Sequence, residues 1–235
     1  MNRKRKALLV LPIIVILIGV GYTLVLGIAP GFDDPTLEFP ISETGSIERL
    51  SAYHTPDWGE PGVFHNGIDL VISDNVTIVS PVAGTIVSYS EHINPYAGNV
   101  LFEIGIAVNW GWSVGLVLEP GFLDTTNNSL QSGEIDAVVG QRVEPGDALA
   151  TLLFSDNYPH LHYALSSFGS DTCAYNYSSP AAKTTFESIA AASNSTIFYP
   201  YPAPNVLTSP LVLIPLVLTG VYAIVVLVVF RRGSK

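Results

Sequence analysis

Residues 158–165 read YPHLHYAL and place two of the chain's five histidines two positions apart. The run is apolar and rich in β-forming residues, so we expect a strand. In a strand, residues i and i+2 point to the same face, about 6 to 7 Å apart. His160 and His162 then face one side, and Leu161 and Tyr163 face the other. Such a pair can hold a metal, or hold one and serve the chemistry beside it. The alternative is two ordinary half-exposed histidines.

The sequence around this run is of β type from about residue 46 to residue 166. Two segments contain apolar runs around turn residues, and two more are uninterrupted strand candidates. They are NVTIVSPVAGTIVSYSE (75–91), RVEPGDALATLLF (142–154), NVLFEIGIAV (99–108) and WSVGLVLE (112–119). Short strands at this spacing predict a mostly β fold, with a compact antiparallel domain over 46–166.

The segments on either side of this region have a different character. Residues 30–45 contain three prolines and predict an extended spacer. Residues 167–210 predict an irregular segment, in which SPAAKTTFESIAAASN (179–194) favours one short helix that starts near Ser179.

Two apolar segments lie near the ends of the 235-residue chain and account for much of its 48% hydrophobic content. Residues 7–29 carry no charge over 23 positions, and residues 211–230 carry none over 20. Each is long enough for a helix to cross about 30 Å of hydrocarbon. The alternative for the first segment is a cleaved signal peptide, whose apolar region is usually about 7 to 15 residues. The first segment is longer than that, so we expect two transmembrane helices.

The charged residues predict the orientation of these helices. Seven of the 10 basic residues flank them, four at positions 3–6 and three at 231–235. Because Lys and Arg concentrate on the cytoplasmic side, both termini are expected inside the cell and residues 30–210 outside it. That external part holds three basic residues and all 20 acidic residues, a net charge of −17. Such a charge argues against a nucleic-acid partner.

The cysteine and the glycosylation sequons do not indicate a catalytic site. Cys173 is the only cysteine, which excludes an internal disulfide, and we interpret it as an unpaired structural thiol. Four Asn-x-Ser/Thr sequons fit an extracytoplasmic glycoprotein; they begin at Asn75, Asn127, Asn176 and Asn194.

A second group of metal-ligating residues lies upstream of the histidine pair. In VFHNGIDLVI (63–72), His65 and Asp69 are four positions apart, and Gly67 between them permits a close approach of backbone. Two ligands from one short segment and a third from a distant one are typical of a catalytic zinc site. His65, Asp69 and one histidine of the 160/162 pair would complete such a site.

Taken together, HNGIDL, VSPVAGTIV, VEPGDALA and HLHY occur in an order and spacing that resembles the lysostaphin-type zinc metalloendopeptidases. The resemblance covers about residues 46–166. It implies a β domain of the duplicated-hybrid-motif kind that cuts peptide bonds, in known members those of bacterial cell-wall cross-links. It also implies that His65, Asp69 and His162 bind Zn²⁺ and that His160 acts beside the metal as general base or transition-state donor.

The sequence departs from this family in one segment. Members usually carry a further histidine in a Tyr-x-His-Leu segment, to which GWSVGLVLEPG (111–121) should correspond. Our alignment places Leu118 at the position of that histidine. Because successive side chains of a strand point to opposite faces, we expect Glu119 to face away from the site. His54 and His92 are interpreted as ordinary surface histidines. The metal site is predicted to be complete. Without the further histidine, the catalytic rate is predicted to be about 10²- to 10³-fold lower than in members that carry it.

Three other functions remain as alternatives to a peptidase. The first is a catalytically weakened zinc-binding or cell-envelope binding module of the same fold. The second is a lipoyl- or biotin-carrier-like domain, which we set aside because no lysine lies between Lys6 and Lys183. The third is a serine hydrolase with Ser113 in GWSVG, which we set aside because the segment after it predicts more strand and not a helix.

Overall fold

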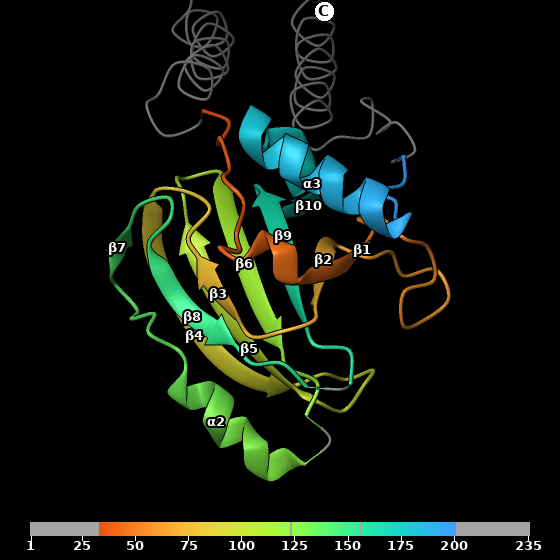
Figure 1. Cartoon of the computed structure of the whole chain (residues 1–235). Coiled ribbons are helices and arrows are strands. Elements are labelled where there is room, and N and C mark those ends of the chain that lie inside the picture. The colour runs from red at the N-terminus through yellow and green to blue at the C-terminus, as the bar shows by residue number, and fades with distance from the viewer. Residues whose placement is uncertain (1–32, 123, 156, 201–235) are drawn as a thin grey trace, which may run out of the picture. The chain divides into compact units, whose positions relative to one another are not determined.

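The computed structural model describes residues 33–200, apart from residues 123 and 156 (Figure 1). The predicted transmembrane segments 7–29 and 211–230 lie outside the described residues. Among the residues that are described, no helix has both the length and the apolar character needed to cross a membrane.

Residues 33–200 form a mostly β fold with one large and one small antiparallel sheet. The large sheet has the strand order β1-β2-β9-β6-β5-β4-β7, and β10 pairs with β9; the small sheet consists of β3 and β8. The strands are β1 (Ile47–Ser51), β2 (Gly67–Ile72), β3 (Val76–Val79), β4 (Gly84–Ile93), β5 (Val100–Ala107), β6 (Trp112–Glu119), β7 (Arg142–Val143), β8 (Ala148–Leu152), β9 (His160–Ser167) and β10 (Ser170–Thr172). The prediction of a mostly antiparallel β architecture is confirmed.

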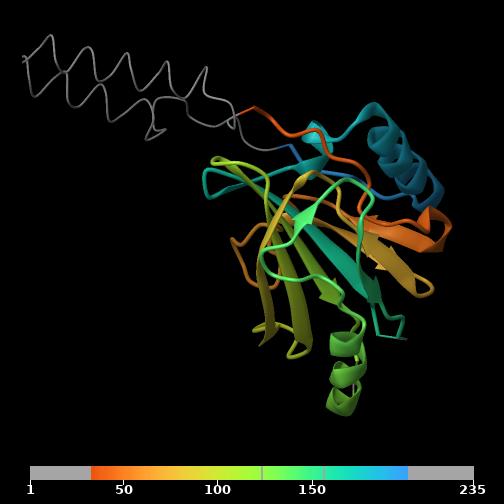
Figure 2. The ribbon, with the colours of Figure 1, turned by 90° about the vertical axis from the view of Figure 1, so that its left-hand side faces the viewer.

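Two helices accompany the sheets, α2 (Asn128–Gly133) and α3 (Pro180–Ser193). Helix α3 lies near β1 and β2, and α2 projects at the other end of the sheet, as both views show (Figures 1 and 2). The start of α3 follows from its sequence: the Ser179 hydroxyl accepts a hydrogen bond from the backbone N–H of Ala182 (3.1 Å), and Pro180 occupies the first turn.

One face of the large sheet points into the hydrophobic core, and strand alternation decides which residues do so. In β6, Trp112, Val114, Leu116 and Leu118 are buried, while the residues between them are more exposed. In β9 the core-facing residues are Leu161, Tyr163 and Leu165, each fully buried. His160 and His162, which alternate with these residues, therefore face the opposite side, as the sequence predicts.

Candidate metal centre

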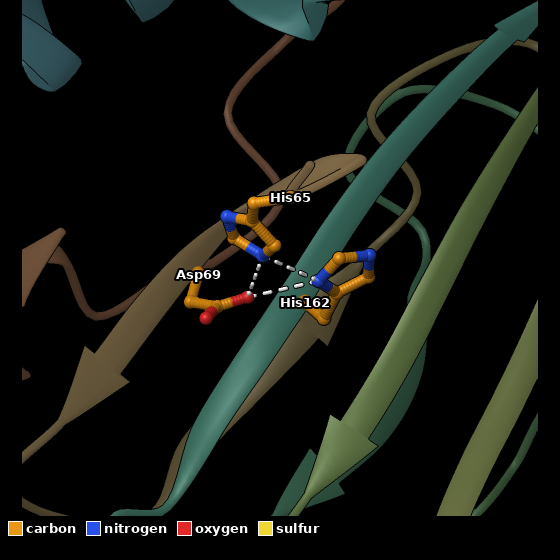
Figure 3. A group of neighbouring side chains, drawn as sticks. All are labelled: His65, Asp69 and His162. Carbon is orange, nitrogen blue, oxygen red and sulfur yellow. Dashed lines mark hydrogen bonds and ion pairs between the residues drawn. The ribbon is translucent and has the colours of Figure 1, made fainter. Parts of the chain in front are cut away.

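His65, Asp69 and His162 come together on the face of the sheet that points away from the core (Figure 3). Asp69 lies in β2 and is directly opposite His162 of β9 in the strand pairing. His65 precedes β2, and its backbone N–H and C=O both pair with the 54–55 segment. One short segment that includes β2, and the distant strand β9, thus position the three side chains predicted to bind metal.

The ligand atoms of the three residues converge closely. Asp69 Oδ1 lies 3.0 Å from His65 Nε2 and 2.9 Å from His162 Nδ1, and the two nitrogens are 3.1 Å apart. Tetrahedral Zn²⁺ with bonds of about 2.0 to 2.1 Å separates its ligand atoms by about 3.3 Å. The spacing therefore fits a shared metal ion.

Hydrogen bonding fixes which nitrogen of His65 faces the centre. Its Nδ1–H donates to the backbone carbonyl of Ala52 (2.8 Å), so in the neutral ring Nε2 carries the lone pair. A lone pair that faces a carboxylate oxygen at 3.0 Å is repulsive without a cation between them. His65 is 1% exposed, and the ring of Trp58 stacks on it at 4.1 Å. The imidazole is thus presented in the state that binds metal.

The Asp69 carboxylate is buried and charged. It is 1% exposed, and its Oδ2 atom has no hydrogen-bond partner. Burial would raise the pKa of Asp69, but the neighbouring imidazoles, His162 foremost, hold it well below its usual range. An ionised carboxylate with a buried oxygen that lacks a partner is costly. A divalent cation would offset this cost, which is a second indication that these residues fit a metal ion.

Gly67 makes room for the His162 ring. A Cβ atom at position 67 would lie 2.6 Å from both Cε1 and Nε2 of His162, and 2.9 Å from the carbonyl oxygen of Tyr163. The glycine between His65 and Asp69 is therefore required by the side chain that approaches from β9.

His160 lies beside this group but does not converge with it. Its Nε2 atom is 3.9 Å from Asp69 Oδ2 and 3.4 Å from Glu119 Oε1, while Nδ1 is 2.9 Å from the carbonyl oxygen of Tyr158. Burial would lower the pKa of His160, but Glu119 and Asp69 outweigh burial and raise it to about 9. The ring can therefore carry a proton on both nitrogens.

Glu119 is a site residue that the alignment missed. It is directly opposite His160 in the pairing of β6 with β9, whereas Leu118 is opposite Leu161 and fully buried in the core. The expectation that position 118 lines the site and that Glu119 faces away is therefore wrong. The alternation of WSVGLVLE (112–119) predicts the observed orientation, because the large apolar residues at every second position, including Leu118, are those expected to face the core.

Two amides hold the other oxygen of Glu119. Asn94 and Asn99, from the β4–β5 connection, both lie with Nδ2 close to Glu119 Oε2, at 3.3 and 3.1 Å. Burial would raise the pKa of Glu119, but the hydrogen bond and charge of His160 lower it. The carboxylate is thus fixed from one side while its Oε1 faces His160.

The remaining candidates from the sequence are not among the side chains that converge here. His54 is 7% exposed and stacks on Phe64 at 4.2 Å, so the expectation that it is a surface histidine is wrong, whereas His92 is exposed on β4 as expected. Ser113 lies within β6 and is followed by more strand, so it is not on the strand-to-helix turn that a serine hydrolase needs. Cys173 is 4% exposed, and burial raises its pKa to about 11, as befits a structural thiol.

Comparison with known proteins finds similarity in structure only. No family model matches the sequence, and no curated protein matches it significantly. Solved structures do resemble the chain, at sequence identities of 20% or less.

A zinc-containing peptidase from Vibrio cholerae is 17% identical with a TM-score of 0.42; the match covers 59% of this chain and 39% of that one. The catalytic domain of lysostaphin from Staphylococcus simulans is 19% identical with a TM-score of 0.36, over 53% of this chain and 83% of that one. The catalytic domain of a prophage-encoded M23 protein from Enterococcus faecalis, in a mutant form, is 20% identical with a TM-score of 0.37, over 52% and 81%.

Proposed function

We propose that residues 33–200 form a zinc metalloendopeptidase that hydrolyses peptide bonds. The observation that carries this proposal is the convergence of His65 Nε2, Asp69 Oδ1 and His162 Nδ1 within about hydrogen-bond distance of one another, with a fourth polar side chain, His160, beside them. Two imidazoles and one carboxylate are a ligand set of catalytic zinc, and three protein ligands leave a position for substrate. Zinc bound there would supply a Lewis acid that activates water and polarises the scissile carbonyl.

The residues of the chain divide the remaining work. His65, Asp69 and His162 hold the metal, and the Ala52 carbonyl keeps His65 in its ligating tautomer. His160 acts as a proton donor to the substrate, because its Nδ1 is bonded to the Tyr158 carbonyl and its Nε2 lies beside the metal ligands, 3.9 Å from Asp69 Oδ2 and 3.4 Å from Glu119 Oε1. Glu119 holds the His160 ring in this orientation. Positioning of this kind keeps the donor within reach of the reacting atoms.

The cellular setting belongs to the same proposal. Segments 7–29 and 211–230 would anchor the chain in the lipid bilayer as two helices, with residues 30–210 on the extracytoplasmic side of the cell membrane. The basic flanks and the charge-free length of both segments support this arrangement. A peptidase anchored there would reach peptides of the cell envelope, including cell-wall cross-links.

A second candidate function is a zinc-dependent binding module of the cell envelope. Glu119 favours it, because the residue opposite His160 is a hydrogen-bond acceptor where a second donor would assist the reaction. A carboxylate beside the site does not stabilise a developing negative charge. The two candidates share the metal centre and differ only in turnover.

Zinc content and peptide cleavage by the purified full chain test the proposal. Alanine at His65, Asp69 or His162 is expected to remove the metal, because a three-ligand site rarely survives on two. His160→Ala is expected to keep the metal and to lower turnover by about 10²- to 10³-fold. The matched control is His92→Ala, which removes an exposed histidine and should change neither property.

Two results would change the proposal. Loss of zinc from His160→Ala to the same degree as from the other three variants would make His160 a ligand. A wild-type chain that binds zinc but cleaves neither peptides nor wall fragments would favour the binding module.

A further inference from the structure

A row of side chains crosses the site face of the sheet and extends beyond the metal centre. Arg49 of β1 is opposite Val71 of β2, and Val71 is opposite His160 of β9. Leu50, next to Arg49, is 6% exposed and packs in the core, so Arg49 points to the face that carries His160. Neighbouring strands are about 4.8 Å apart, which places the backbone of Arg49 about 10 Å from that of His160.

Tyr158 connects the two ends of this row. Its ring lies 5.0 Å from the guanidinium carbon of Arg49 and 5.0 Å from the ring of His160. Its hydroxyl is 2.7 Å from the Ser51 hydroxyl. The backbone of Tyr158 has a positive φ of 58°, which is uncommon for a large residue. Because contacts on both sides hold the ring, it provides a fixed apolar surface between Arg49 and His160.

A hollow opens at the Arg49 end of this row of side chains. It has a volume of about 220 Å³ and is lined by Arg49, Val71, Phe154 and Tyr158, among others. Sites for drug-sized ligands are usually about 300 to 1,000 Å³. The hollow is therefore of a size for a side chain or the end of a peptide, and not for a long glycan.

Arg49 is the only basic residue of the external part on this side of the sheet. The other two are Arg142, in β7 at the opposite edge of the sheet, and Lys183, in α3. Among the described residues, no carboxylate forms an ion pair with the Arg49 guanidinium. In a region of net charge −17, an unpaired guanidinium supported on an aromatic ring is a local site for an anion.

We propose that the hollow is a substrate subsite in which Arg49 binds a carboxylate of the peptide. This inference deepens the proposed peptidase function and takes its relevance from it. A guanidinium can bind a carboxylate through two parallel hydrogen bonds. An extended peptide spans about 3.3 Å per residue, so the carboxylate would lie about three residues from the bond next to His160. The preferred substrates are then peptides with an acidic side chain or a free carboxyl end at that distance.

Glu48 gives this subsite an internal test. It also lines the hollow and is the extra residue where the pairing of β1 with β2 shifts register between Ile47 and Arg49. Its charge would repel a bound carboxylate. Removing that charge should therefore strengthen binding, whereas removing the charge of Arg49 should weaken it.

Binding of two matched pairs of peptides to the zinc-loaded full chain tests the subsite. One pair is N-acetyl-pentaglycine with a free carboxyl end and with a carboxamide end. The other is N-acetyl-Glu-tetraglycine amide and its Gln counterpart. We expect the wild type to bind the acidic member of at least one pair about three- to tenfold more tightly in calorimetry. Arg49→Gln should abolish this preference, Glu48→Gln should increase it, and the matched control Arg142→Gln should leave it unchanged.

Binding and cleavage separate this inference from the proposed function. Preferential binding that depends on Arg49, without cleavage, would support the subsite and count against the peptidase. Cleavage of both members at equal rates with equal affinities would overturn the subsite and leave the peptidase intact. A preference that survives Arg49→Gln, or no measurable binding of any of the four peptides, would also overturn it.

Discussion

The ion pair between Glu119 and His160 makes the stability of the metal-free protein depend on pH. Protonated His160 is stabilised in the folded state, since its pKa rises from 6.5 to about 9. This contribution is complete below about pH 6.5 and is lost as the pH rises through about 9. Glu119→Gln should therefore lower the stability of the chelator-treated chain by about 1 to 3 kcal/mol at pH 6 and have little effect at pH 10.

Thermal unfolding followed by tryptophan fluorescence, from pH 6 to 10, measures this difference. The control is Glu144→Gln, an exposed carboxylate in the β7–β8 turn, which should leave the profile unchanged. Equal destabilisation by Glu119→Gln at both ends of the range would mean that the carboxylate acts by packing and not by pairing with His160.

At the scale of single residues, the sequence predicts ligand identity well and orientation less well. The spacing of His65, Asp69, His160 and His162 predicts four side chains that the structure brings to one place. The error concerns Glu119, because a gapless alignment to a remote motif can shift by one residue, and a shift of one residue in a strand exchanges its two faces. The core-facing alternation of β6 was the better guide.

At the scale of elements, the site depends on how closely β2 and β9 approach. Asp69 and His162 are directly opposite each other, and Gly67 lies opposite Ala164. A methyl group at position 67 would enter the space of the His162 ring. We therefore expect Gly67→Ala to displace this ligand and to weaken zinc binding by about 10- to 100-fold, the range typical of lost support around a ligand.

Competition with a chromophoric chelator would measure the zinc affinity of this variant. The matched control is Gly115→Ala in β6, where a Cβ would meet only Ala164 Cβ at 3.6 Å, an ordinary contact. Circular dichroism should show the same β content in both variants. Unchanged zinc affinity in Gly67→Ala would show that His162 can reach the metal by another path.

The elements themselves follow from local signals to different degrees. Alternation predicts β5 and β6, and the Ser-Pro pair predicts the start of α3, because caps and periodicity are properties of neighbouring residues. Two of the strands that pair with β9, namely β2 and β6, are distant from it in sequence. Pairing of this kind depends on side chains brought together by the whole fold, so it could be inferred only through the family resemblance.

At the scale of the whole molecule, the proposed membrane anchors predict where residues 33–200 lie. The basic flanks predict an external location for them. We expect a membrane-impermeant maleimide to label Ser90→Cys on intact cells, because residue 90 is exposed on β4. Asn2→Cys and Ser234→Cys should be labelled only after the cells are permeabilised.

The native chain is its own control in this experiment, because Cys173 is 4% exposed and should remain unlabelled while the fold is intact. Labelling at position 2 or 234 from outside would contradict the predicted orientation, as would protection of position 90 until permeabilisation. Mass spectrometry of the mature chain tests the cleaved-signal alternative, since removal of residues 1–29 would eliminate the label at position 2 under both conditions. If residues 1–29 are removed, segment 211–230 alone would anchor residues 33–200 outside the cell. The metal centre would still face the envelope peptides on which the proposed function depends.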